Sequence, residues 1–237
     1  MSRAVEGEAR LVELSRAYAL PPGAEEALRR LLALIAEDGH APTTVRERAR
    51  AVDVHVADSL SGLELEVVRA ARAIADLGAG AGFPGLALAV ALPAAEVALV
   101  DSVGRKCSFM ERGIAAAGIG NARVVCARAE EWRDGIGAHD LVTARALAPL
   151  AVIGEYAAPL LAVGGHLVAW KGAREPGEEA DAAAAARELG LEEVQVVRVY
   201  PFERAEQRHL YVYSKVMETP PRFPRRAGMA RKRPLSR

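Results

Sequence analysis

The sequence contains little cysteine, no long hydrophobic run and no net charge. Only two cysteines, Cys107 and Cys126, occur among 237 residues, and neither has a CxxC or Cys/His spacing. This excludes a disulfide scaffold and a four-cysteine metal site, so we interpret both as reduced thiols and expect no metal. The longest uncharged apolar stretch, residues 83–95, is shorter than the ~20 residues of a membrane span, and the first residues lack a secretory pattern. We therefore predict a cytoplasmic protein without membrane contact.

The charge is unevenly placed along the chain. The sequence has 31 basic and 31 acidic residues, which argues against a protein that is basic over its whole surface. Residues 222–237 nevertheless contain seven basic residues and no acid, so residues 1–221 carry a net charge of −7. Such a tail either contacts an anionic partner or stays solvated.

The first seventy residues have the pattern of a helical segment. In residues 24–38 apolar side chains recur at helical spacing, with charged residues on the other side and Gly39 as a stop. A second helix is predicted at 48–60, where we expect His55 and Asp58 to form a hydrogen-bonded pair that holds this segment to the core. We predict three regions: a helical extension at 1–70, a core at 71–217 and a basic tail at 218–237.

From residue 72 onward short apolar runs alternate with helical stretches, which is typical of a parallel sheet covered on both faces. Strands are predicted at 73–77, 97–101, 123–126, 140–143, 166–170, 193–200 and 210–215, and helices at 85–92, 106–117, 150–163 and 177–189. The short return at 204–208 makes the last two strands antiparallel. This layout predicts the α/β fold of class I S-adenosylmethionine-dependent methyltransferases, with a Rossmann-like, mostly parallel seven-stranded sheet, because a dinucleotide-binding sheet is wholly parallel.

The first predicted strand leads directly into a glycine-rich loop. Two patterns overlap there: Asp76, Gly78, Gly80 and Gly82 suit S-adenosylmethionine, and Gly80, Gly82 and Gly85 suit a dinucleotide. Pro84 removes an N–H donor that a pyrophosphate would use, whereas Asp76 offers a carboxylate to the cationic groups of S-adenosylmethionine. Asp101 ends the next strand, where an acid binds ribose hydroxyls. We favour S-adenosylmethionine as the cofactor, and an NAD-dependent oxidoreductase is the alternative.

At these residues the chain resembles the RsmG family, also called GidB, of guanine-N7 methyltransferases that act on small-subunit ribosomal RNA. The resemblance covers nearly the whole chain. It is carried by HVADSL at 55–60, DLGAGAGFPG at 76–85, LVDSVGRK at 99–106, RAEE at 128–131, ARA at 144–146, WKG at 170–172, RHL at 208–210, FPRRAG at 223–228 and KRPL at 232–235.

The resemblance implies methyl transfer from S-adenosylmethionine to guanine N7 in the decoding-region loop of 16S rRNA, with the rRNA or the small subunit as the partner. The cofactor positions that it implies are Gly78, Phe83, Asp101 with Ser102, Ala129 with Glu130, and Arg145. Guanine N7 has a free lone pair near neutral pH, so we expect no general base and a rate that depends on positioning and electrostatics. A noncatalytic rRNA-binding assembly factor is a further alternative.

Several cations are candidates for contact with the RNA. Arg145 could bond to the cofactor or clamp a phosphate, and Lys171 ends a strand at the edge of the sheet where ligands bind. In the basic tail we expect Arg225, Arg226 and Lys232 to contact rRNA phosphates.

Overall fold

The computed structural model describes residues 3–203 and 205–235, with only the backbone described at 3–5. Arg204, at the start of the predicted return, and Arg237, in the basic tail, lie outside the described residues. None of the helices in these two ranges is long and apolar enough to cross a membrane.

The N-terminal residues are helical, as predicted. The helices are α1 (Arg3–Ala17), α2 (Ala24–Glu37), α3 (Arg48–Ala51), α4 (Asp58–Leu60) and α5 (Glu66–Arg69). The predicted helix at 48–60 is interrupted, because Val52–Ala57 forms a π-helical segment between α3 and α4. Such single π turns occur frequently at functional sites.

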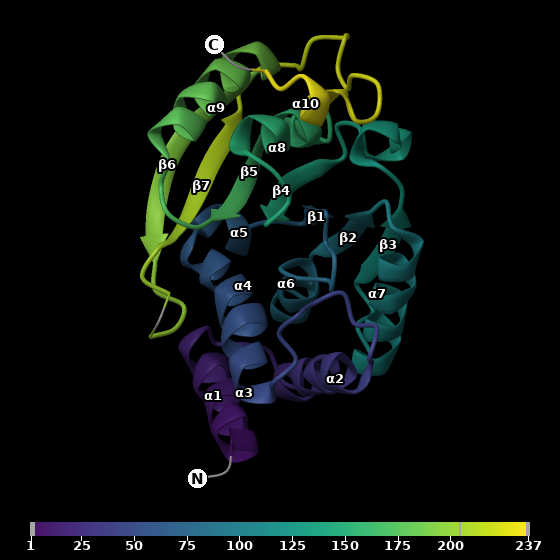
Figure 1. Cartoon of the computed structure of the whole chain (residues 1–237), viewed down its shortest axis with the longest axis vertical. Helices are drawn as coiled ribbons and strands as arrows, with labels where there is room; N and C mark the ends of the chain where they lie inside the picture. The colour runs from purple at the N-terminus through teal and green to yellow at the C-terminus, as the bar shows by residue number, and fades with distance from the viewer. Residues whose placement is uncertain (1–2, 204, 236–237) are drawn as a thin grey trace.

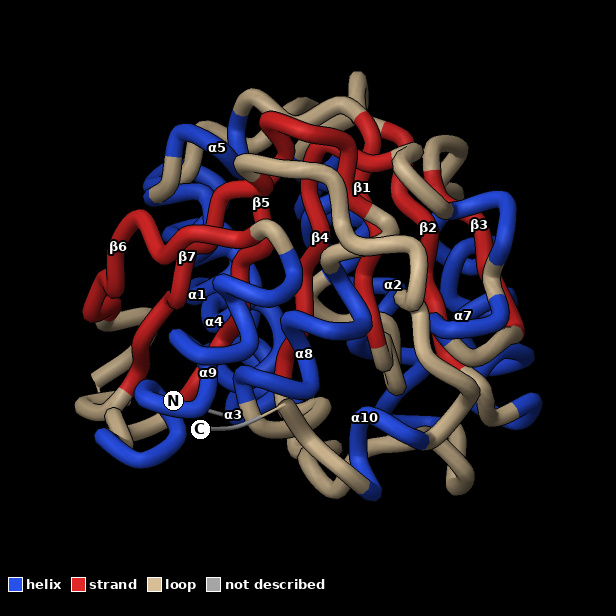
Figure 2. Tube along the Cα trace, turned by 90° about the horizontal axis from the view of Figure 1, so that it is seen from above, coloured by secondary structure: helices blue, strands red, loops and turns tan. Residues whose placement is uncertain are grey.

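The sheet has the predicted topology. Its strands are β1 (Ala73–Leu77), β2 (Glu96–Asp101), β3 (Ala122–Cys126), β4 (His139–Arg145), β5 (Leu161–Lys171), β6 (Leu191–Val199) and β7 (Arg208–Lys215). They lie side by side in the order β3-β2-β1-β4-β5-β7-β6 (Figure 2). β7 is antiparallel to both of its neighbours, whereas β1 to β5 pair in parallel. The prediction of a mostly parallel sheet with an antiparallel last strand is confirmed.

Helices cover both faces of the sheet, so the fold has three layers (Figure 1). Between the strands lie α6 (Gly85–Ala91), α7 (Gly104–Ala117), α8 (Leu150–Ala157) and α9 (Pro176–Leu189), and α10 (Met229–Lys232) follows near the end of the chain. Apolar strand residues alternate between the two faces, as the period of a strand requires: Ile74 and Leu99 pack with α2, α6 and α7, whereas Ala75 and Val100 pack with α8 and α9.

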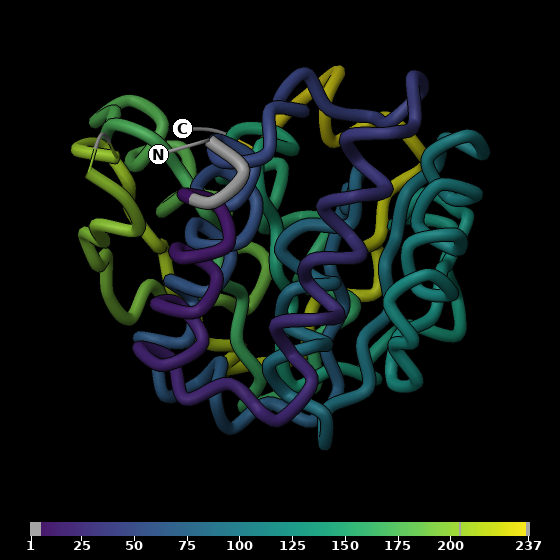
Figure 3. Tube along the Cα trace, turned by 90° about the horizontal axis from the view of Figure 1, so that it is seen from below, coloured from purple at the N-terminus to yellow at the C-terminus, as the bar shows by residue number. Residues whose placement is uncertain are grey.

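The N-terminal helices and the described part of the C-terminal segment lie on opposite faces of the sheet. Figure 3, seen from below, shows the N-terminal helices in front and the C-terminal segment behind. Leu28 and Val56 of the extension share one hydrophobic cluster with Val212 of the sheet, and Phe223 and Ala230 of the tail belong to the other cluster. The N-terminal helices and the C-terminal segment therefore each contribute to a hydrophobic core, on opposite sides of the sheet.

The predicted helix at 150–163 is wrong at its C-terminal end. α8 ends at Ala157, and β5 begins at Leu161 rather than at residue 166. The apolar residues between them fit a buried helix or a buried strand equally well, so periodicity could not separate the two. Gly164, at φ 90°, takes a backbone conformation that an L residue rarely adopts and lies within the strand.

Candidate functional site

The glycine-rich loop follows β1 and ends where α6 begins, and Asp76 fixes this path from inside the protein. Its Oδ2 accepts a hydrogen bond from the backbone N–H of Gly85 at 2.9 Å, and its Oδ1 accepts one from the Thr143 hydroxyl at 2.9 Å. The side chain is 0% exposed, and burial raises the pKa of its carboxyl group to about 6. Both carboxylate oxygens of Asp76 are therefore engaged within the protein, where they hold the loop, and direct contact of Asp76 with the cofactor stays a prediction.

Gly78 begins the loop with φ 66° and lies where the chain leaves β1. A Cβ atom on Gly78 would overlap the side chain of Leu147, which follows β4. The lack of a side chain at this position is therefore needed for the packing of the protein itself as well as for the approach of a ligand.

A cavity of about 290 Å³ opens at the carboxyl ends of β1, β2 and β3. Five residues predicted for the cofactor line it: Gly78, Asp101, Ser102, Ala129 and Glu130. Gly80, Gly82 and Phe83 do not line it, although the N–H of Gly80 donates to Asp101 Oδ2 at 3.2 Å and so ties the loop to the cavity. Ligands of open α/β sheets bind at this edge.

Asp101 presents a carboxylate to the cavity. Its Oδ1 accepts from the N–H of Val103 at 3.0 Å, and Lys106 Nζ lies 3.2 Å from its Oδ2. The Asp101 side chain is 5% exposed and that of Lys106 32% exposed, so the lysine closes over the acid from the solvent side. This ion pair joins the end of β2 to the first turn of α7.

The cavity wall after β4 contains a strained residue. Ala146 has φ 53°, in the left-handed region that costs a side chain of this kind on the order of 1 kcal/mol. The neighbouring Leu147 also lines the cavity. Strained residues of this type concentrate at functional sites.

Arg145, predicted to bind the cofactor or the RNA, does not line the cavity. Its guanidinium donates to Asp58 Oδ2 at 2.8 Å and to the carbonyl oxygen of Val54 at 2.8 Å. Arg208 Nε lies 3.3 Å from the other oxygen of Asp58, and the Trp170 indole N–H donates to the Asp58 carbonyl oxygen at 2.8 Å. Asp58 therefore joins the helical extension to the ends of three strands.

The predicted pair between His55 and Asp58 is wrong. His55 Nε2 lies 3.2 Å from Thr43 Oγ1 and 3.1 Å from the carbonyl oxygen of Val45, and the imidazole ring stacks on Phe83 with 5.1 Å between the centroids. Burial, aided by the positive charge of Arg145, lowers the pKa of His55 to about 4. The imidazole is therefore neutral at pH 7.

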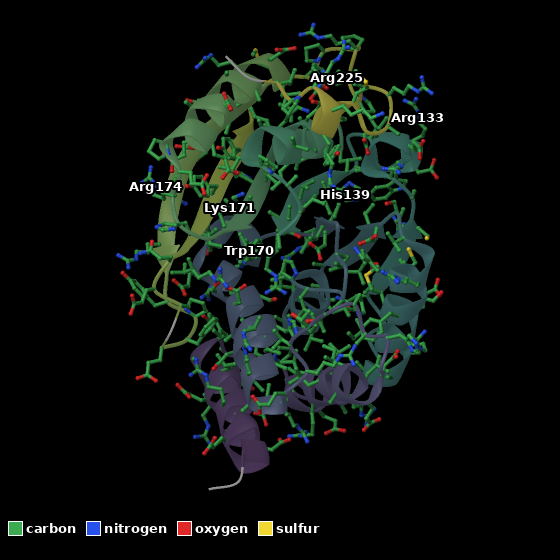
Figure 4. All side chains as sticks on the ribbon, in the orientation of Figure 1. Arg133, His139, Trp170, Lys171, Arg174 and Arg225 are labelled. Carbon is green, nitrogen blue, oxygen red and sulfur yellow. The ribbon has the colours of Figure 1, made fainter. Side chains whose placement is uncertain are left out.

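The cations expected to contact RNA differ in their surroundings. Arg225 forms two hydrogen bonds to Glu155, at 2.6 and 2.5 Å, and Lys171 Nζ lies 2.6 Å from Glu178. Figure 4 shows Arg225 at the C-terminal segment and Lys171 well away from it, at the end of β5. Arg226 and Lys232 are exposed. Of the five candidates, only these last two present their charge to solvent in this way.

A larger cavity, of about 1310 Å³, lies elsewhere, between the helical extension and the segment that joins β6 to β7. It is lined by acids and bases together, among them Glu47, Asp53 and Arg50, and by no residue of the glycine-rich loop. The smaller cavity is therefore the candidate cofactor site, because the loop and Asp101 meet there. Among the described side chains no group of three or more His, Cys, Asp or Glu residues could hold a metal ion.

The sheet order and the cavity at its edge define a methyltransferase fold. Among solved structures, the chain resembles a SAM-dependent methyltransferase from Aquifex aeolicus, with a TM-score of 0.54, 15% identity, and coverage of 70% of this chain and 93% of that one. It also resembles geranyl diphosphate methyltransferase in complex with SAM, with a TM-score of 0.54, 16% identity, and coverage of 78% and 94%. At such identities these likenesses show the fold alone.

Sequence comparison identifies the particular family. The family model for GidB, rRNA small subunit methyltransferase G, matches residues 24–211. The chain is 42% identical over 189 residues to the ribosomal RNA small subunit methyltransferase G of Rubrobacter xylanophilus, covering 76% of this chain and 72% of that protein. The Alkaliphilus oremlandii protein of the same name is 35% identical over 197 residues, with coverage of 81% and 82%. The chain belongs to the rRNA small subunit methyltransferase G family, so the resemblance inferred from its motifs is confirmed.

Proposed function

We propose that this protein transfers the methyl group of S-adenosylmethionine to N7 of a guanine in the decoding-region loop of 16S rRNA, and that it does so in the cytoplasm. One observation carries the proposal: in a member of this family, the start of the glycine-rich loop, the acid that ends β2 and the residues that follow β3 line a single cavity. The antiparallel β7 argues against an NAD-dependent oxidoreductase, whose sheet would be wholly parallel.

The residues around the cavity suit S-adenosylmethionine. Asp101 offers a carboxylate to the two ribose hydroxyls, and Gly78 allows the ligand to approach the backbone where β1 ends. Ala129 and Glu130 form a turn of 3₁₀ helix beside them, where they can border the adenine ring. When bound, the cofactor supplies an electrophilic methyl group on a sulfonium.

The protein needs to supply position rather than a base. Guanine N7 attacks through a lone pair that is free at neutral pH, so no proton has to be removed before methyl transfer. His55, with its pKa lowered to about 4, stays neutral at pH 7 and stacks on Phe83 of the glycine-rich loop, so it adds no charge under that loop. The contribution of the chain is to hold the methyl group and N7 in line in a site of limited volume.

Contact with the rRNA is proposed for Arg226 and Lys232, which are exposed on the same C-terminal segment as Arg231, a residue that lines the cavity. Each phosphate contact adds about −0.7 to −0.9 to the slope of log K against log salt. The double variant with serine at both positions should therefore have a slope shallower by about 1.5. A slope that does not change would show that these two cations remain solvated and do not contact the RNA.

A methylation assay tests the proposal. The purified protein is incubated with labelled S-adenosylmethionine and either naked 16S rRNA or small subunits that lack the mark, and the digested rRNA is analysed for N7-methylguanosine by mass spectrometry. We expect one modified guanine per rRNA in at least one of the substrates, and at least a tenfold lower rate for Asp101→Ala because the ribose loses its acceptor (about 1.4 kcal/mol or more). Binding of rRNA without methylation would support the assembly factor instead, and binding of NAD the oxidoreductase.

A further inference from the structure

The C-terminal segment 218–235, here called the strap, is an ordered part of the fold. Phe223 and Ala230 are 7% and 1% exposed and pack in the core on the side of α8 and α9. Arg225 binds the carboxylate of Glu155, whose side chain is only 2% exposed. The sequence predicted a cationic tail for RNA contact, but the buried apolar residues and this ion pair fix the strap against the protein.

The strap also contacts two walls of the candidate cofactor site. The N–H of Gly228 donates at 2.8 Å to Oε1 of Glu130, a residue that follows β3. Arg231 Nη2 donates at 2.9 Å to the carbonyl oxygen of Leu147, a residue that follows β4. Arg231 itself lines the cavity, together with Tyr156 of α8. One short segment therefore bridges the β3 and β4 exits and places a guanidinium at the cavity.

We propose that the strap forms a wall of the cofactor site and that Arg231 contacts the adenosine half of S-adenosylmethionine. This inference rests on the proposed function. Arg231 was counted in the sequence only as one charge of the tail, since nothing in the pattern of the tail related it to a cavity built by residues 75 to 154 positions earlier.

Electrostatics assigns Arg231 to the adenosine half rather than to the reacting end. A guanidinium close to the reacting end would be repelled by the sulfonium and the ammonium and attracted only by the methionine carboxylate, whereas adenine is neutral and presents a flat ring and acceptor nitrogens. Arginine stacks on planar rings and donates in their plane, so either geometry is favourable.

The neighbours of Arg231 agree with this assignment. Glu130 belongs to the β3 exit, the wall expected to border the adenine. Its Oε1 is engaged by the strap, so an adenine amino group would meet Oε2. Tyr156 completes this corner, and burial together with the negative charge of Glu130 raises the pKa of its hydroxyl, which keeps the ring neutral.

Isothermal titration calorimetry on the full chain tests the proposal with two ligands: S-adenosylhomocysteine and 5′-methylthioadenosine, which lacks the amino-acid portion. We expect Arg231→Ala to raise the Kd of both ligands by about tenfold. Arg231→Lys keeps the charge but loses the planar group, and should also weaken both. The matched control is Arg233→Ala, which removes the same charge from an exposed position two residues away and should leave both Kd values unchanged.

Each outcome separates the two proposals. If the wild-type protein binds both ligands and Arg231→Ala and Arg231→Lys keep its Kd values within twofold, Arg231 is not a cofactor contact. If the loss is confined to S-adenosylhomocysteine, the guanidinium binds the amino-acid end and the adenosine assignment is overturned. If the wild-type protein binds neither ligand, the methyltransferase function itself fails. Thermal melting of each variant identifies a loss of binding that comes from unfolding.

Discussion

The buried carboxyl group of Asp76 makes the stability of this protein depend on pH in a way that one substitution should remove. Both oxygens of Asp76 accept hydrogen bonds, from the Gly85 N–H and from the Thr143 hydroxyl. An asparagine can keep both bonds, with its amide oxygen toward Gly85 and its amide nitrogen toward the Thr143 oxygen, because the hydroxyl can also accept. Asp76→Asn therefore removes the charge and conserves the geometry.

The magnitude follows from the pKa of Asp76, which burial raises from 3.8 to about 6. Because the folded value lies above the unfolded value, the folded protein binds this proton more tightly than the unfolded chain. The resulting stabilisation is complete below about pH 4 and is lost as the pH rises through about 6, and it amounts to about 3 kcal/mol. Relative to wild type, Asp76→Asn should gain about this much unfolding free energy between pH 4 and pH 7.

Urea unfolding of both proteins, followed by circular dichroism at several pH values, measures this difference, and other titrating groups largely cancel between the two curves. Thr143→Val is a second check: it removes a hydrogen bond that favours the charged form, so its stability should fall more steeply with pH than that of wild type. A difference between Asp76→Asn and wild type that stays constant from pH 4 to pH 7, or that shrinks as the pH rises, would refute the reasoning.

Two further predictions concern packing and pairing. Arg225→Ala should lower the unfolding free energy by about 3–5 kcal/mol, because it leaves the buried carboxylate of Glu155 unpaired. Its control, Arg226→Ala at an exposed position, should change the unfolding free energy by less than about 0.5 kcal/mol. Similar urea midpoints for the two variants would show that the ion pair does not hold the strap. Gly85→Ala would press a Cβ atom against side chains of β1 and β2 and should lower the unfolding free energy by about 1–3 kcal/mol. A Cβ atom at Gly104 meets open space, so Gly104→Ala should leave the stability nearly unchanged. Equal melting temperatures of the two variants would contradict the packing argument.

Much of the fold could be predicted because it depends on local patterns. All seven strands lie where the apolar runs indicated, with ends that differ by only a few residues in most cases. The fold differs from the prediction at positions where one sequence pattern is compatible with two kinds of secondary structure. The apolar residues from the end of α8 into the start of β5 suited a helix or a strand. The π turn at Val52–Ala57 adds a residue to a helix that periodicity predicts as regular.

The site could be predicted in part. Gly78 and Asp101 could be expected at one cavity because strand ends and glycine loops are local signals that share one edge of a parallel sheet. The contacts of the Asp76 side chain could not be predicted, because a carboxylate at a strand end faces either the ligand or the next helix, depending on the path of the loop. The bond between Gly228 and Glu130 joins residues 98 positions apart, and no periodicity reports such a pairing.

The junction at Asp58 has a consequence for the order in which the chain can fold. Its carbonyl oxygen accepts from Trp170, 112 residues later, and its carboxylate meets Arg145 and Arg208. The helices of the extension can form from local contacts, but the sheet surface that buries their apolar side exists only when β4, β5 and β7 are paired. Until then that side is exposed to water and to other chains, so the yield of active protein should depend on folding speed and on chaperones as much as on the final stability.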